Sequence, residues 1–230
     1  MSAYLKRLLR DNFSFVLIVV IVTTVCVVIF LLPAEIKDML VVKTQVFNPL
    51  SFISANFVSY NLTYLLNGLS TSLVAFLLLH IICRKVDGQK IFSLSVLMVF
   101  TILPLIYLGI LFPRLHPNSE GYGLSLVNSG LIGLSITYLV GFYRNRFAKF
   151  DLHSFFTSMR KERETFVDVI ILCVHIIFYI ISIPALFPSN IILDSVQVDV
   201  FAHSFGLVFG FVVGFLVTYS LSSARPLRWL

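Results

Sequence analysis

The sequence predicts an all-α membrane protein built as a bundle of six transmembrane helices. Hydrophobic residues make up 58% of the 230 positions and charged residues only 12%, whereas a soluble domain carries about 25% charged residues. Runs of about 20 apolar residues with few charges are typical of transmembrane helices. The chain contains six such runs, at about residues 13–32, 57–83, 91–112, 123–142, 165–187 and 200–221.

The first run is expected to stay in the mature protein as a span. It is too long for the apolar segment of a signal peptide, and no small-residue cleavage site follows it. The spans succeed one another without a soluble insertion, which predicts a single membrane domain over residues 1–230. Residues 33–56, between the first two spans, are rich in apolar side chains such as Met39, Leu50 and Phe52. We expect this external loop to associate with the membrane or to pack on the bundle.

The basic residues predict the orientation of the bundle. With the N-terminus inside, the cytoplasmic segments hold 14 of the 17 Lys and Arg residues, and only Lys37, Lys43 and Arg114 lie outside. This is the positive-inside bias, and it places both termini in the cytoplasm. The net charge of +6 therefore reports topology and indicates no nucleic-acid partner. Cys26, Cys83 and Cys173 stand singly, without metal-ligand spacing, so we expect no metal and no cofactor.

Two of the histidines within the spans differ in their neighbours. His175 has no small neighbours and is expected to bond a helix carbonyl in a structural role. His203 differs because Gly206, Gly210 and Gly214 follow it at intervals of four residues. Such a glycine stripe lets another helix approach closely.

The fourth span offers a matching face. Ser125, Ser129 and Gly133 recur every four residues and share one side of a helix. A stripe of this kind also fits helix packing alone. However, Ser125 and His203 each lie about four residues inside the outer end of a span that runs inward, or roughly 6 Å deep at 1.5 Å per residue. A hydroxyl beside an imidazole is a nucleophile with its general base.

These residues carry a resemblance to a known family. Gly123-Leu124-Ser125, followed by Gly130 and Gly133, is similar to the serine motif on the fourth span of the rhomboid intramembrane proteases. Ala202-His203-Ser204-Phe205-Gly206, followed by Gly210, is similar to their histidine motif on the sixth span. The resemblance covers most of the chain from about residue 49 onward, although the motifs occupy only short stretches.

The resemblance implies an intramembrane serine protease that hydrolyses peptide bonds in or near transmembrane segments of other membrane proteins. It makes Ser125 the nucleophile and His203 its base, with the oxyanion bound by the Ser125 backbone N–H and the Asn67 amide. It also implies a multi-pass protein of a prokaryotic cell membrane whose partners are transmembrane substrates and the lipid bilayer. The implied helix-packing glycines are Gly123, Gly130, Gly133, Gly206 and Gly210.

Three positions depart from the family pattern. Leu126 follows the serine where the family carries glycine, Ser129 stands where an aromatic residue is common, and Thr63 replaces a histidine on the second span. These departures leave open a catalytically inactive rhomboid-like protein that binds membrane clients. A small transporter using His175 and His203 as a proton relay is a second alternative, although no pair of broken spans indicates the inverted-repeat site of such proteins.

Overall fold

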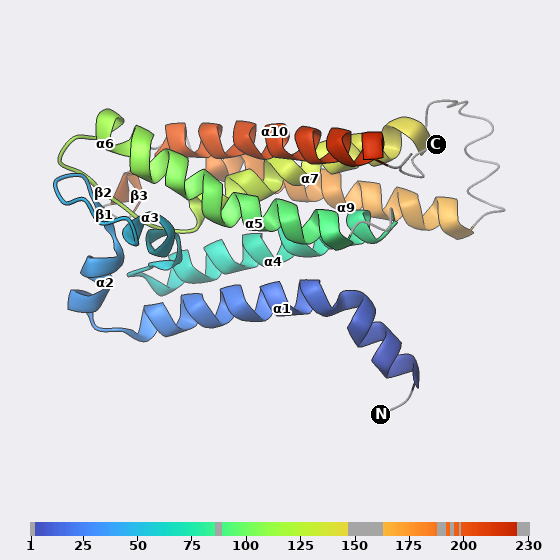
Figure 1. Cartoon of the computed structure of the whole chain (residues 1–230), viewed down its shortest axis with the longest axis horizontal. Coiled ribbons are helices and arrows are strands. Elements are labelled where there is room, and N and C mark those ends of the chain that lie inside the picture. Colours follow the sequence, from blue (N-terminus) through green and yellow to red (C-terminus); the bar gives the residue numbers. More distant parts are fainter. Residues whose placement is uncertain are drawn as a thin grey trace.

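The long helices of the computed structural model run side by side along one axis (Figure 1). The structure describes residues 3–85, 89–146, 163–187, 192–193, 196–197 and 199–224. The long helices in this part of the chain are α1 (Ala3–Leu31), α4 (Leu62–Lys85), α5 (Gln89–Ile106), α7 (Ser125–Arg146), α9 (Arg163–Leu186) and α10 (Val200–Ala224). Helix α5 continues through a π-helical segment, η2 (Tyr107–Leu111), into α6 (Phe112–Leu115).

Among the described residues, five helices are long and apolar enough to cross a bilayer, as expected for a helical membrane protein. Their apolar stretches are Asn12–Leu31, Leu62–Cys83, Phe92–Leu115, Phe166–Pro184 and Val200–Val217. Helix α7 corresponds to the predicted fourth span, but its apolar stretch is shorter, covering Ser125–Gly141.

Two helices begin later than the approximate bounds given by the sequence, and local backbone chemistry explains both. The second span begins at Leu62 rather than near residue 57, because the Asn61 side chain caps the helix by accepting the N–H of Thr63 at 2.7 Å. The fourth span begins at Ser125 rather than at 123. Gly123 has a φ of +101°, which a right-handed helix does not allow. The third span also extends past residue 112, to Leu115.

The loop between α1 and α4, the predicted external loop, folds against one end of the bundle. It contains α2 (Ala34–Leu40), β1 (Val42–Lys43), α3 (Ser51–Ser54) and a 3-10 turn, η1 (Ala55–Phe57). Val42 and Phe52 are buried, whereas Phe47 is 82% exposed and Leu50 is 78% exposed. The loop therefore packs on the bundle through one side and presents apolar side chains on the other.

Two short antiparallel strand pairs lie at the same end of the bundle as this loop (Figure 1). Strand β1 pairs with β2 (Glu120–Gly121), where the Lys43 ammonium lies 3.3 Å from the Glu120 carboxylate. Strand β3 (Ile192–Leu193) pairs with β4 (Val196–Gln197). The first residues of α1 and the last residues of α10 lie at the opposite end of the bundle (Figure 1).

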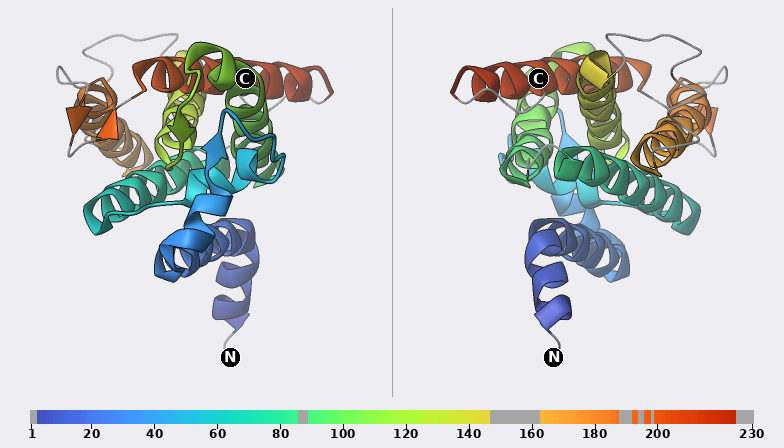
Figure 2. Two further views of the ribbon diagram at one scale, coloured as in Figure 1. Left: turned by 90° about the vertical axis from the view of Figure 1, so that its left-hand side faces the viewer. Right: turned by 90° about the vertical axis from the view of Figure 1, so that its right-hand side faces the viewer.

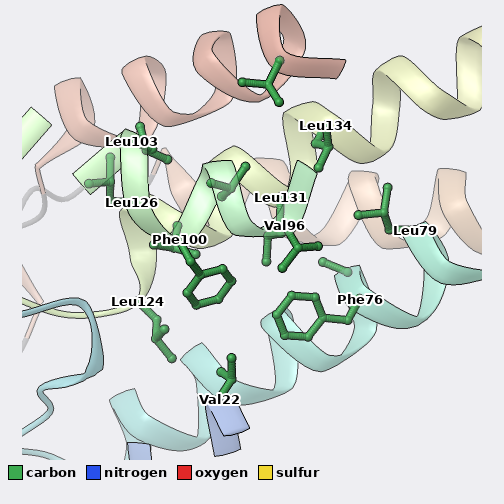
Figure 3. Close-up of a cluster of buried hydrophobic side chains, with 14 of the residues drawn as sticks. Val22, Phe76, Leu79, Val96, Phe100, Leu103, Leu124, Leu126, Leu131 and Leu134 are labelled. Atoms are coloured by element: carbon green, nitrogen blue, oxygen red, sulfur yellow. The ribbon is translucent and has the colours of Figure 1, made fainter. Parts of the chain in front are cut away.

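Helix α7 lies at the centre of the bundle, in contact with α4, α5, α9 and α10. Close-packed side chains from α4, α5 and α7, among them Phe76, Phe100 and Leu131, meet in the core (Figure 3). Helices α1 and α9 lie at the periphery (Figure 2) and bury the smallest share of their apolar stretches. The helix that carries Ser125 is thus enclosed along most of its length.

Candidate functional site

Glycines bring α7 and α10 into backbone contact. A Cβ added at Gly206 would lie 2.6 Å from the carbonyl oxygen of Leu126, and one added at Gly210 would lie 2.0 Å from that of Gly130. From the other side, a Cβ at Gly133 would lie 2.1 Å from a carbonyl oxygen of α10. Any side chain at these positions would collide with the neighbouring backbone. The contact pairs advance together along both helices, so α7 and α10 are parallel.

The register of this contact sets the level of the two candidate catalytic residues. Gly206 lies opposite Leu126 and Ser129. The Cβ of Ser129 is 3.0 Å from the position that a Cβ added at Gly206 would take. His203 comes one turn before Gly206, and Ser125 comes one turn before Ser129. The structure therefore brings Ser125 and His203 to the same level of adjacent helices, near the first residues of both. Ser125 is exposed, and His203 is only 4% exposed.

Ser125 is the first residue of α7. The first N–H groups of a helix have no acceptor within the helix, so the backbone N–H of Ser125 is oriented to donate to a group outside it. Helix N-termini also carry partial positive charge, which favours a nearby anion. This is the local geometry that an oxyanion beside Ser125 requires.

Gly123 differs from the expectation that it packs against a helix. Nothing lies within 4 Å of a Cβ built on it, and its φ of +101° lies in the region that favours glycine. Its N–H donates to the carbonyl of Ala55, in the loop between α1 and α4, at 2.8 Å. Gly123 thus turns the chain into α7 and ties the start of this helix to the loop.

The hydroxyl of Ser129 bonds within its own helix. Its Oγ donates to the carbonyl oxygen of Ser125 at 2.8 Å, and the residue is fully buried against α10. This environment suits a packing residue, in contrast to the exposed position of Ser125.

Asn67 lies on α4 at the level of Ser125, and its side chain is exposed. The next residue, Gly68, contacts α7 directly: a Cβ there would lie 3.3 Å from Leu124, and its carbonyl accepts the Asn128 amide at 3.0 Å. Asn67 thus comes one residue before the α4 glycine that contacts Leu124, the residue preceding Ser125.

Asn128 is a buried polar residue whose role the sequence analysis missed. Besides donating to Gly68, it accepts the Ser72 hydroxyl at 2.5 Å, so one side chain joins α7 to two turns of α4. An Asn in an apolar run is itself a signal, because such residues bond across helices in membranes. Its position three residues after Ser125 makes this bond a determinant of where Ser125 lies relative to Asn67.

Replacement of Asn128 by alanine should destabilise the bundle by about 1–2 kcal/mol, because it removes two interhelical hydrogen bonds and leaves the Ser72 hydroxyl buried. Equilibrium unfolding in mixed micelles, followed by circular dichroism, measures the change. Ser70→Ala is the matched control, since the exposed Ser70 hydroxyl bonds only a carbonyl of its own helix. Equal stability of Asn128→Ala and Ser70→Ala would contradict the role given to Asn128.

Asp199 lies one turn before His203 but holds the start of α10. Its Oδ1 accepts the N–H of Ala202 at 2.9 Å, and its Oδ2 accepts the hydroxyl of Tyr107. The His203 ring makes an edge contact with Phe187, with ring centroids 6.3 Å apart. The carboxylate is therefore engaged as a helix cap.

His175 lies in α9, where it is fully buried. Its Nδ1 donates to the Ile171 carbonyl at 2.7 Å, which is the helix-carbonyl bond expected from the sequence. Its ring also contacts Tyr179 at 6.1 Å between centroids, and Tyr179 shares a 2.7 Å hydrogen bond with Ser135 of α7. These contacts connect α9 to the centre of the bundle.

Two tyrosines lie near the first residue of α7. The rings of Tyr60 and Tyr122 meet edge to face, with centroids 5.2 Å apart. Burial, and then the hydrogen bond and charge of Asp38, raise the pKa of Tyr60. Burial, and then Tyr64 and Glu120, raise the pKa of Tyr122. Both phenols are therefore neutral at physiological pH, and together they form an uncharged aromatic pair beside the first residue of α7.

No group of three or more His, Cys, Asp or Glu side chains that could hold a metal ion occurs within the described residues. A scan against protein-family models, a search of curated proteins and a search of solved structures each gave no match to this chain.

Proposed function

We propose that this chain is an intramembrane serine protease of the rhomboid type that uses Ser125 and His203 as a catalytic pair. In this proposal α7 is a sixth membrane span, both termini are cytoplasmic, and the chain lies in the cell membrane of a prokaryote. One observation carries the proposal: the glycine contact between α7 and α10 sets an exposed serine and a buried histidine at the same level.

The chemistry follows from the two side chains. The Oγ of Ser125 attacks the carbonyl carbon of the scissile peptide bond while a ring nitrogen of His203 takes the hydroxyl proton. The tetrahedral intermediate collapses to an acyl ester on Ser125, and His203 returns the proton to the leaving amine. Water then attacks the ester with His203 again as base, which releases the carboxylate product and restores the Ser125 hydroxyl.

The negative charge of the intermediate requires donors that are already in place. The backbone N–H of Ser125, at the start of α7, and the side-chain amide of Asn67 are the groups proposed for this role. A preorganised donor of this kind contributes about 3–4 kcal/mol to transition-state stabilisation. Asn67 lies five residues after Leu62, the first residue of α4, or about one and a half turns into the helix.

The direct test uses the purified full-length protein with a reporter transmembrane substrate in proteoliposomes. Cleavage of the substrate, together with covalent labelling of the protein by a fluorophosphonate, would support the proposal. A folded protein that neither cleaves nor reacts would instead favour the inactive rhomboid-like alternative. Thr63 gives that alternative its support, because it is exposed at the position where the family carries histidine.

Asn67→Ala should lower kcat by about 10²–10³ with little loss of stability, because it removes one oxyanion donor from an exposed position. Initial cleavage rates over a range of substrate concentrations separate kcat from KM. Ser70→Ala, also exposed and one turn further along α4, is the matched control and should retain the wild-type rate. Full activity in Asn67→Ala would leave the backbone N–H as the only proposed donor.

A further inference from the structure

Tyr107 forms a contact between α5 and the first turns of α10. It is the first residue of the π-helical segment η2 and is 1% exposed. Its ring lies 6.2 Å from Phe201 and 5.6 Å from Phe205, measured between centroids, and its hydroxyl donates to Asp199. π-Helical turns occur frequently at functional sites. Here the turn places one phenol beneath the outer end of α10.

Asp199 joins this phenol to the helix backbone. One carboxylate oxygen accepts the N–H of Ala202 at 2.9 Å, and the Asp199 backbone carbonyl accepts the N–H of His203 at 3.2 Å. The other carboxylate oxygen accepts the Tyr107 hydroxyl and lies 3.2 Å from Nε2 of His116. Asp199 is therefore the N-cap of α10, and its negative charge suits the helix N-terminus.

The outer end of α10 is thus held from two sides. Helix α7 holds it at Gly206, one turn after His203, through the backbone contact described above. The α5 side holds it at Asp199, one turn before His203, through Tyr107. His203 lies between the two points of attachment.

We propose that Tyr107 and Asp199 are positioning residues for catalysis: together they fix the first turn of α10 so that the His203 ring stays in reach of Ser125. The inference rests on the proposed function, since it assigns the two residues a role in holding the general base. Neither residue touches the reacting atoms. Positioning of this kind has large kinetic effects, because a misplacement of about 1 Å costs about 10²-fold in rate.

Tyr107→Phe tests the inference with the smallest change, since it removes the hydroxyl and keeps the ring between Phe201 and Phe205. We expect the rate of fluorophosphonate labelling and kcat to fall by about tenfold, at unchanged KM. Amide hydrogen exchange in residues 200–203 should become faster. Asp199→Ala should lower kcat and the labelling rate by about 10²-fold. Asp199→Asn should recover most of that loss, because the asparagine side-chain carbonyl still caps the helix and its amide N–H still donates to the Tyr107 hydroxyl.

Tyr138→Phe is the matched control for a general loss of stability. Tyr138 is also a buried tyrosine, and its hydroxyl shares a 2.6 Å hydrogen bond with Ser95 of α5. It lies 13 residues after Ser125 on α7, about 20 Å away along the helix. Its variant should keep the wild-type labelling rate and the wild-type exchange of residues 200–203.

The outcomes separate this inference from the proposed function. A wild-type labelling rate in Tyr107→Phe, or an equal loss of labelling rate in Tyr138→Phe, would overturn the positioning role. Neither outcome would contradict the proposed protease function. Absence of labelling in the wild type would overturn the proposed function and the role of His203 as a base. Faster amide hydrogen exchange in Tyr107→Phe would then show that the Tyr107–Asp199 contact stabilises the start of α10 without a role in catalysis.

Discussion

Ser125→Ala and His203→Ala are each expected to abolish substrate cleavage and fluorophosphonate labelling. The first removes the attacking oxygen and the second removes the base that takes its proton, so each loss should reach about 10⁶-fold in kcat. The double variant should be no worse than either single one, because nucleophile and base act as a unit. Ser125 is exposed, so Ser125→Ala should unfold close to wild type in the micelle assay. His203 is buried, so His203→Ala should also lose some stability, because it removes a packed ring from the start of α10.

Ser129→Ala is the control that separates catalysis from packing. Ser129 shares a helix face with Ser125, but its hydroxyl donates to the Ser125 carbonyl and is fully buried. A methyl group fills nearly the same space, so this variant should remain active and labelled. Labelling that disappears with Ser129 and persists in Ser125→Ala would show that the wrong serine was assigned.

Hydropathy was sufficient to predict which segments form the long helices, because apolar runs of this length have few alternatives to a transmembrane helix. The helix starts required local signals that hydropathy averages out. Asn61 stands two residues before the Thr63 N–H that it caps, and Gly123 adopts a positive φ. Both residue types were visible in the sequence, and capping preferences would have placed both starts more closely.

The long-range polar contacts are the part of the site that the sequence could not supply. Tyr107 and Asp199 lie 92 positions apart, and Ser72 and Asn128 lie 56 apart. No local pattern pairs such residues, because their meeting depends on how four helices pack. Asp199 lies one turn before His203, and the structure shows that its carboxylate caps the start of α10. The preference of Asp for N-cap positions is the signal that favoured this outcome.

Gly210→Ala is expected to destabilise the bundle more than any other single methyl added on α10, by at least about 3 kcal/mol. The new Cβ would lie 2.0 Å from the carbonyl oxygen of Gly130 and 2.7 Å from the backbone nitrogen of Leu134. Backbone atoms within a helix cannot rotate away, so α10 must move off α7 as a whole. Unfolding in mixed micelles measures the loss, and Gly133→Ala, which meets a carbonyl of α10 at 2.1 Å, should behave alike.

Val212→Ala is the matched control on the same helix, because this residue is 50% exposed on the other face of α10. It should change the free energy of unfolding by less than about 0.5 kcal/mol. Moving α10 away from α7 also separates His203 from Ser125, so Gly210→Ala should lose labelling together with stability, whereas Ser125→Ala loses labelling alone. If Gly210→Ala unfolded like Val212→Ala, the two helices could not be in backbone contact, and the shared level of Ser125 and His203 would have no structural basis.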